Sequence, residues 1–311
     1  RGGGGGLRQP AMTSFDYVIV GGGSAGCVLA RRLSDNPGNR VCLLEAGADD
    51  TSPFVHAPLG LAATVSGNYL NWAFKTVPQA GLNGRRGYQP RGKVLGGSSS
   101  INAMIYTRGH PWDYDHWAAL GNPGWSFADV LPYFKMSQNQ ERGGDEFHGT
   151  GGPLNVADLR SPNPLAQAFV DAAAEMQLPR NDDFNGMEQE GVGRYQVTQI
   201  NGERCSAARA YLSPVRSRDN LSILTGAQAT MLILEGKRVL GVRYRQSGAE
   251  HEVHAGREVI LSAGALQTPQ LLLLSGIGPG AALQAKGIDV AHDLPGVGRN
   301  LQDHIDIVIP Y

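Results

Sequence analysis

The feature that most restricts the fold is a glycine-rich turn between an apolar run and a helical pattern. Residues 18–20 (VIV) are typical of a strand that is buried on both faces. Gly21, Gly23 and Gly26 follow in G-x-G-x-x-G spacing, and residues 27–33 have the pattern of a helix. Such a turn places bare backbone and the positive end of a helix dipole beside a pyrophosphate. The stretch therefore predicts a Rossmann-like α/β domain that binds an adenosine dinucleotide.

An acidic residue at the end of the next apolar run supports this prediction. Glu45 closes the run VCLLE, 19 residues after Gly26, where a carboxylate can accept hydrogen bonds from a ribose diol. The carboxylate would repel a 2′-phosphate, so the expected ligand carries none. The alternative is a glycine-rich turn that binds nothing. The motif alone does not separate NAD from FAD.

Composition excludes some classes of function. The chain has 311 residues, enough for two lobes, and a net charge of −1 that gives no sign of a nucleic-acid partner. Its three scattered cysteines form neither a metal-binding pattern nor a disulfide framework, which favours a reducing compartment. No apolar run reaches the length of about 18 residues that a membrane span needs. We expect a cytoplasmic protein whose residues 1–12 form a disordered, glycine-rich extension.

A second stretch of bare backbone lies at residues 91–102, RGKVLGGSSSIN. Its three glycines remove side chains, and residues 98–100 add small hydroxyls and N–H donors. A flat or phosphorylated ligand can therefore rest directly on main chain here. The apolar residues 101–106 that follow predict a buried helix. The alternative is a flexible Gly/Ser linker, although linkers are not usually flanked by sequences such as RGKVL and INAMIY.

The middle of the chain predicts a lid and several helices. Residues 75–90 contain proline and glycine and predict a long irregular loop, which we interpret as a lid. The tryptophan-rich segment 112–125 has aromatic residues at helical spacing and predicts a packed surface subdomain rather than a ligand cage. Residues 164–176 predict an amphipathic helix, and residues 195–200 alternate as an antiparallel strand does.

Strand patterns return near the C-terminal end. Residues 220–247 predict a three-stranded β-meander with glycine-bearing turns, and residues 258–264 predict a buried strand. We expect Thr268 to cap the next helix, Pro269 to take its first position and Gly276 to end it.

These patterns divide the chain into three parts that follow the extension. Residues 13–152 are expected to form the first part of the dinucleotide-binding domain, with the lid near residues 75–90. Residues 153–212 are expected to form part of a substrate-binding lobe. Residues 213–311 are expected to complete the dinucleotide-binding domain.

Four stretches together resemble the glucose–methanol–choline (GMC) family of flavin-dependent oxidoreductases. Residues 92–102 match one family signature, and residues 264–278 (GALQTPQLLLLSGIG) match the other. VGGGSAGCVLARRL with LLEAG matches the nucleotide-binding start of the family, and VGRNLQDH is a further hallmark. The resemblance runs from residue 15 to the last residue. Within the family it is greatest to the bacterial alcohol dehydrogenases of alkane oxidation, followed by the choline dehydrogenases.

The resemblance implies FAD rather than NAD, held by a Rossmann-like α/β domain beside a partial antiparallel-sheet substrate domain. The glycine turn would face the pyrophosphate, Glu45 the adenosine ribose, and the main chain of Ala229 the adenine. Residues 96–104 would lie along the flavin half. The cofactor-binding residues implied are Gly21, Gly23, Ser24, Gly26, Glu45, Ala46, Trp72, Arg91, Val94, Gly96, Gly97, Ser98, Asn102, Ala103, Met104, Ile105 and Ala229.

The resemblance also implies a reaction. An active-site histidine would take the hydroxyl proton of an alcohol while hydride passes to the flavin, which a quinone-like acceptor or oxygen reoxidises. Family members are longer, and their catalytic histidine lies in a C-terminal part that is absent here. His110, His148, His254 and His304 do not match its motif, so we assign no catalytic residue and no metal ligand.

The expected function is therefore FAD-dependent oxidation of an alcohol to an aldehyde. A choline dehydrogenase or an alcohol oxidase of the same family is the alternative. Two further classes stay open: a truncated, catalytically silent FAD-binding fragment, and a non-redox lyase that keeps FAD as a relic. Electron delivery to a quinone would bring the protein to the inner membrane as a peripheral partner, but no basic amphipathic helix supports this.

Overall fold

The computed structural model describes residues 14–304 and 306–308, so the expected extension at residues 1–12 lies outside it. The described residues pack as two compact units. The sheet unit comprises residues 14–48, residues 93–95 and the described residues from 216 onward. The loop-rich unit comprises residues 49–92 and 96–215. The assignment of chain segments to cofactor and substrate stays a prediction.

A mixed six-stranded sheet forms the centre of the sheet unit, with strand order β10-β11-β12-β1-β2-β9. Strands β12, β1, β2 and β9 run parallel, and β10, β11 and β12 form an antiparallel meander. The strands are β1 (Ser14–Val20), β2 (Val41–Leu44), β9 (Leu221–Leu224), β10 (Gln228–Glu235), β11 (Arg238–Gln246) and β12 (Ala249–Leu261).

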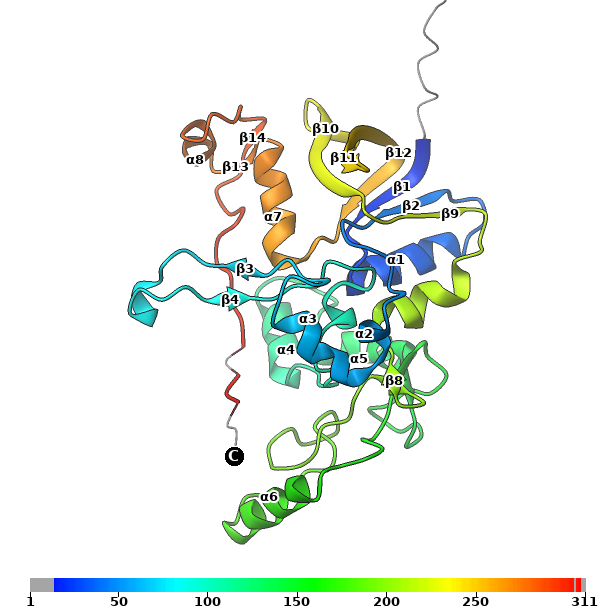
Figure 1. Ribbon diagram of the computed structural model, residues 1–311, viewed down its shortest axis with the longest axis vertical. Coiled ribbons are helices and arrows are strands. Elements are labelled where there is room, and N and C mark those ends of the chain that lie inside the picture. The colour runs from blue at the N-terminus through cyan, green and yellow to red at the C-terminus, as the bar shows by residue number, and fades with distance from the viewer. Residues whose placement is uncertain (1–13, 305, 309–311) are drawn as a thin grey trace, which may run out of the picture. The chain divides into compact units, whose positions relative to one another are not determined.

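The apolar run of the first strand is central to this sheet, as its sequence predicts. Val18, Ile19 and Val20 are buried, and β1 pairs with β12 on one side and with β2 on the other. Helix α1 (Ser24–Ser34) follows directly and packs against β1 and β2, as Figure 1 shows. The predicted strand–turn–helix–strand unit is therefore confirmed.

The predicted three-stranded meander at residues 220–247 is wrong in its first member. β9 joins the parallel part of the sheet through β2, with Val41 opposite Leu221 and Leu44 opposite Leu224. The meander instead uses β12, whose residues 249–254 pair with β11 while its residues 254–261 pair with β1 across a register shift. One long strand thus belongs to both halves of the sheet.

Helix α7 (Gly264–Leu274) begins earlier than the sequence predicts. Ala263 is the N-cap and Gly264 has a φ of +83°, so the chain enters the helix before it reaches Thr268 and Pro269. Pro269 lies inside α7, where it removes one backbone donor without ending the helix. The predicted exit is confirmed, because Ser275 is the C-cap and Gly276 follows with a φ of +79°. The unit continues with β13 (Ile277–Gly278), α8 (Gly280–Gln284) and β14 (His292–Asp293).

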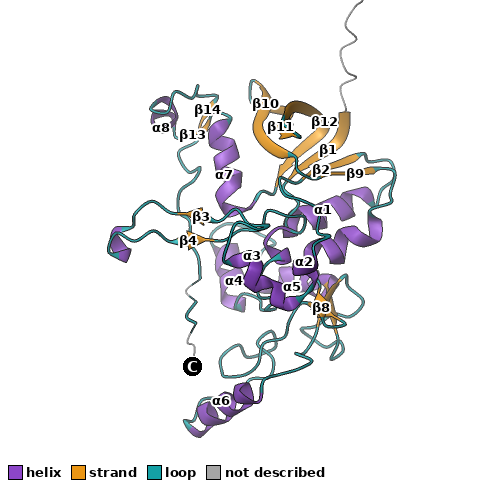
Figure 2. Ribbon diagram, in the orientation of Figure 1, coloured by secondary structure: helices purple, strands orange, loops and turns teal. Residues whose placement is uncertain are grey.

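The loop-rich unit contains short elements joined by long connections, shown in teal in Figure 2. Its α-helices are α2 (Pro53–His56), α3 (Leu61–Val65), α4 (Pro111–Ala119), α5 (Phe127–Ser137) and α6 (Pro164–Glu175). Its strands are β3 (Phe74–Lys75), β4 (Tyr88–Gln89), β5 (Gln138–Gln140), β6 (Leu154–Val156), β7 (Gln199–Ile200) and β8 (Glu203–Arg204). The 3-10 turns lie at Pro58–Gly60, Ala80–Leu82, Gly97–Ser100 and Ser213–Val215, and a π-helical turn lies at Ala208–Leu212.

Two segments of this unit differ from the structure that the sequence predicts, and one helix is as predicted. Residues 75–90 are not fully irregular, because β3 and β4 pair as an antiparallel hairpin around a 3-10 turn. Residues 195–200 form a strand only at Gln199–Ile200. The helix predicted at residues 164–176 is confirmed as α6, but its apolar residues Leu165 and Phe169 are exposed.

Residues 101–106 form no helix. Met104 has a φ of +61°, a left-handed conformation that does not continue a right-handed helix. The side-chain oxygen of Asn102 accepts the Met104 N–H at 3.1 Å, a local bond that competes with helical hydrogen bonding. The preceding glycine–serine run forms the 3-10 turn Gly97–Ser100 instead.

Candidate cofactor site

The glycine turn of the sheet unit leaves no room for side chains at two positions. Gly21 has a φ of +100°, and a Cβ there would lie 2.5 Å from the Ser262 carbonyl oxygen. A Cβ on Gly26 would lie 1.9 Å from the Gly21 carbonyl oxygen. The amide of Gly21 donates to the Leu44 carbonyl at 2.8 Å, which joins the turn to the end of β2. The first and third glycines of the motif are therefore required by close packing.

The start of α1 is open to an anion. Gly23 is the N-cap, no side chain caps the helix, and no acidic residue lies in the first turn. The first N–H groups of a helix have no partner within it, and the dipole favours negative charge there. This cradle of main-chain donors and missing side chains fits the pyrophosphate of a dinucleotide.

Glu45 is buried and holds the turn together. Its two carboxylate oxygens accept the Gly22 N–H at 2.9 Å and the Gly47 N–H at 2.7 Å. Burial raises the pKa of the Glu45 carboxyl to about 7, although both N–H donors and the charge of Lys93 act to lower it. Each carboxylate oxygen can accept a second hydrogen bond, so a ribose hydroxyl remains compatible with this geometry.

The short segment 93–95 packs against the loop that follows Glu45. A Cβ on Gly47 would lie 2.0 Å from the carbonyl carbon of Lys93, and the Leu95 amide donates to Ala48 at 2.9 Å. On the other side, the Ala227 amide donates to the Glu45 carbonyl at 2.8 Å. Eight of the implied cofactor residues thus belong to the sheet unit: Gly21, Gly23, Ser24, Gly26, Glu45, Ala46, Val94 and Ala229.

The second glycine stretch folds into a tight loop within the loop-rich unit. Gly96 has a φ of +90°, and a Cβ there would lie 2.3 Å from the Ser100 side-chain oxygen. A Cβ on Gly92 would lie 2.2 Å from the Gly97 carbonyl oxygen. The Gly92 amide also donates to the Ser98 hydroxyl at 3.1 Å. This ordered packing is unlike a flexible linker: Gly96 and Gly97 are buried, whereas Ser98 is exposed.

Nine implied residues belong to the loop-rich unit: Trp72, Arg91, Gly96, Gly97, Ser98, Asn102, Ala103, Met104 and Ile105. Trp72 stacks on Phe74 with ring centroids 5.6 Å apart. The Arg91 side chain donates to the Pro90 carbonyl and to Gln89. Met104 is buried, whereas Ile105 is half exposed.

Sequence reasoning missed Arg204 of β8. Its guanidinium donates to the carbonyl of Ser99, within the glycine–serine loop (residues 92–100), and to the carbonyl of Asn102, just after that loop. The stretch GERCSAARAYL carries no periodic or motif signal that would identify a buried arginine, so only the three-dimensional contacts show it.

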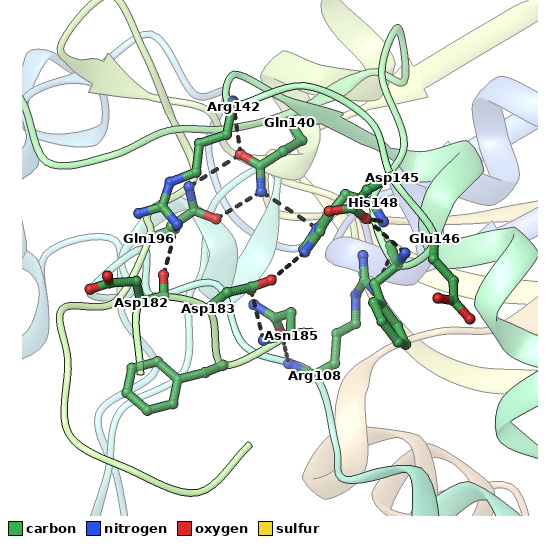
Figure 3. Close-up of polar contacts among 12 residues, drawn as sticks. Arg108, Gln140, Arg142, Asp145, Glu146, His148, Asp182, Asp183, Asn185 and Gln196 are labelled. Atoms are coloured by element: carbon green, nitrogen blue, oxygen red, sulfur yellow. Dashed lines mark hydrogen bonds and ion pairs between the residues drawn. The ribbon is translucent and has the colours of Figure 1, made fainter. Parts of the chain in front are cut away.

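Two described histidines, His148 and His110, take structural positions. His148 is buried, its Nε2 lies 2.9 Å from Asp183, and its Nδ1 lies 3.1 Å from the Gln138 side chain. Figure 3 shows this ring between Gln140 and Asp183. The hydrogen bond from His148 is the main cause of the lowered pKa of Asp183. Because both ring nitrogens are engaged, His148 is not placed to take a proton from a substrate.

His110 is also a structural residue, because its Nδ1 accepts the Trp112 amide and caps α4. The part of the chain that the structure describes contains no group of three or more His, Cys, Asp or Glu placed to hold a metal ion. None of its helices combines the length and the apolar character needed to cross a bilayer.

The two C-terminal signature stretches meet in the sheet unit. A cavity of about 450 Å³ lies between α7 and the loop Gly298–Gln302. Its lining includes Ala265, Pro269 and Leu273 from the helix. The structure therefore brings residues of the GALQTPQLLLLSGIG and VGRNLQDH motifs together.

The sheet with its glycine turn, buried Glu45 and open helix start defines an α/β dinucleotide-binding protein, as predicted. The family model of the GMC oxidoreductases matches residues 15–306, so this chain belongs to the GMC oxidoreductase family. Members of this family bind FAD, which decides between FAD and NAD.

Comparisons with curated proteins agree. The chain is 52% identical over 298 residues to an alcohol dehydrogenase [acceptor] of Pseudomonas putida, covering 95% of this chain and 54% of that protein. It is 46% identical over 302 residues to human mitochondrial choline dehydrogenase, covering 95% of this chain and 51% of that protein. The chain thus spans about half the length of the curated relatives it matches.

Solved structures show the same fold. Pyridoxine 4-oxidase from Mesorbium loti matches with a TM-score of 0.89 and 42% identity, over 93% of this chain and 57% of that one. Formate oxidase from Aspergillus oryzae matches with a TM-score of 0.87 and 31% identity, over 95% of this chain and 53% of that one. The Rossmann-like fold class predicted from the sequence is confirmed.

Proposed function

We propose that the full-length protein containing this chain is an FAD-dependent alcohol dehydrogenase. It would oxidise the CH–OH group of an alcohol to an aldehyde. The observation that supports this most is the 52% identity to an alcohol dehydrogenase [acceptor] across 95% of the chain. The glycine turn, Glu45 and the glycine–serine loop supply the features that an extended dinucleotide cofactor requires.

This chain would contribute the cofactor cradle. Gly21 and Gly26 would hold the turn open for the pyrophosphate, and the amides at the start of α1 would neutralise its charge. Glu45 would fix the turn and accept a ribose hydroxyl. The residues from Gly96 to Met104 would lie along the flavin half through their main chain. FAD, when bound, supplies the two-electron redox chemistry.

We assign no proton-transfer residue to this chain. His148 and His110 make structural hydrogen bonds, and the proposal assigns the base to the remaining polypeptide. Such a base contributes on the order of 10²–10⁴-fold to the rate. The identity of the alcohol would also depend mostly on that part of the protein.

The electron acceptor is proposed to be a quinone, reached by peripheral contact of a cytoplasmic protein with the inner membrane. A direct test is a steady-state screen of short-chain alcohols, long-chain alcohols and choline with the full-length protein, using a quinone analogue or oxygen as acceptor. Turnover of alcohols with the quinone analogue and little with oxygen supports the proposal. Preference for choline supports a choline dehydrogenase, and turnover with oxygen alone supports an oxidase.

The second candidate is that the 311-residue chain alone is a silent FAD-binding fragment. The observation in its favour is that the chain covers only 54% of its alcohol dehydrogenase relative. Expression of residues 1–311 alone should then give no alcohol oxidation with any acceptor. Measurable turnover by that chain would exclude this candidate.

A further inference from the structure

Arg204 carries a charge deep inside the loop-rich unit without a carboxylate partner. It is 1% exposed and is the largest fully buried side chain among the described residues. Buried charges are normally paired with an opposite charge. Instead, Nε donates to the Val55 carbonyl at 2.9 Å, and Nη2 has no hydrogen-bond partner in the described chain. Burying an unpaired charge costs free energy, so packing alone does not explain an arginine at this position.

Nη1 is directed at the loop implied to bind the flavin. It donates to the Asn102 carbonyl at 2.7 Å, to the Asn102 side-chain oxygen at 2.8 Å and to the Ser99 carbonyl at 3.2 Å. The segment after β8 adds another contact, because the Ala207 amide donates to the Ser99 hydroxyl at 2.9 Å. Ser99 in turn donates to the Gly96 carbonyl at 2.6 Å. Residues 204–207 thus hold the C-terminal end of the 3-10 turn directly and its N-terminal end through Ser99.

These contacts fix the orientation of the Asn102 amide. Its side-chain oxygen accepts from Arg204 and from the Met104 N–H. Both of these donors require oxygen, not nitrogen, at that position. The amide nitrogen makes no hydrogen bond within the described chain, and Asn102 is an exposed residue. The side-chain N–H groups of Asn102 are therefore available as donors, and the family resemblance implies that Asn102 lies along FAD.

We propose that Arg204 is a positioning residue for the cofactor: it locks the 3-10 turn and the Asn102 amide so that the amide nitrogen donates a hydrogen bond to FAD. The inference rests on the proposed placement of FAD along Gly96–Met104. It does not depend on the identity of the alcohol, or on alcohol oxidation as the reaction.

The test is a double-mutant cycle in the full-length apoprotein, with FAD affinity measured by quenching of flavin fluorescence. Arg204→Lys and Asn102→Ala should each raise the FAD dissociation constant about tenfold, as expected for loss of a hydrogen bond to or from a fixed polar group. The FAD dissociation constant of the double variant should lie within about threefold of that of either single variant, because Arg204 acts through Asn102.

The matched control is Arg218→Lys in the sheet unit. Like Arg204, Arg218 donates to both a backbone and a side-chain oxygen. Its acceptors are the Arg31 carbonyl and the Ser34 hydroxyl, in the last turn of α1. This variant should lower the melting temperature while the FAD dissociation constant stays within about twofold of the parent. A tenfold loss of FAD affinity in the control would overturn the specific role of Arg204.

Asn102→Asp provides an independent test if the arginine variants do not fold. A carboxylate still accepts from Arg204 and Met104, but it has no donor for FAD. The proposal predicts weaker FAD binding with an unchanged or higher melting temperature. FAD binding equal to the parent would overturn it, as would fully additive effects in the cycle. Absence of alcohol oxidation with normal FAD affinities would instead contradict only the proposed function.

Discussion

The carboxylate of Glu45 accepts the amide hydrogen of Gly22 at 2.9 Å and so joins the end of β2 to the glycine turn. The same side chain accepts the Gly47 amide at 2.7 Å, so one buried acid connects two loops of the sheet unit. Its role is therefore structural in the apoprotein, in addition to the ribose contact proposed for the holoprotein.

The first prediction concerns pH. Because burial raises the pKa of Glu45 from 4.5 to about 7, the neutral form is favoured on folding. The contribution to stability is fully present below pH 4.5 and is lost as pH rises through about 7. The free energy of unfolding of the apoprotein should fall in this range by on the order of 3 kcal/mol. Glu45→Gln, which cannot ionise, should remove this dependence.

The measurement is denaturant unfolding of the parent and variant apoproteins at a series of pH values. Glu250→Gln is the matched control, because Glu250 is an exposed residue of β12 and should leave the pH profile unchanged. Parallel profiles for the parent and Glu45→Gln would contradict the assignment.

The second prediction concerns the glycine turn. Gly26→Ala would place a Cβ 1.9 Å from the Gly21 carbonyl oxygen, so the backbone of the turn must move. FAD affinity should fall by about tenfold or more, since donors that bind the pyrophosphate must be held in place. Gly67→Ala is the control, because a Cβ there meets nothing within 4 Å. Normal FAD binding by Gly26→Ala, measured by fluorescence titration, would be incompatible with this turn as the pyrophosphate site.

The third prediction concerns His148, which is bonded at both ring nitrogens. His148→Gln should lower the free energy of unfolding by about 1–3 kcal/mol, because buried partners lose hydrogen bonds. The folded variant should keep its rate of flavin reduction within about threefold, since a catalytic base would be worth on the order of 10²–10⁴-fold. Stopped-flow reduction by alcohol measures this rate.

Asp171→Asn is the control for that variant, because Asp171 forms an exposed ion pair with Arg180 and should affect neither quantity measurably. A loss of about a hundredfold in flavin reduction by folded His148→Gln would identify His148 as catalytic and contradict its structural role.

The parts of the fold that sequence predicts well are those specified by local spacing. β1, the glycine turn and α1 follow from residues close together in the chain, and the close approach of Gly26 to Gly21 is a local requirement. The pairing of β9 with β2 is different, because it joins segments far apart in sequence and no local pattern names the partner. The meander was therefore predicted with the wrong first strand.

The candidate site shows the same division. The glycines predict where a cofactor can contact main chain, and the family resemblance implies the other cofactor-binding residues. Residues 101–106 were misread as a helix because their apolar character is visible in sequence while the Asn102–Met104 hydrogen bond is not. Arg204 was missed because its importance lies in contacts with Val55, Ser99 and Asn102, each distant in the chain.

The most direct test of the account is anaerobic titration of the purified full-length holoprotein with primary alcohols, followed by the absorbance of the oxidised flavin. The proposed function predicts that an alcohol bleaches the flavin band and yields a stoichiometric amount of aldehyde. A flavin band that persists with every alcohol and with choline, while FAD stays tightly bound, would contradict alcohol oxidation and favour a protein that keeps FAD without redox chemistry.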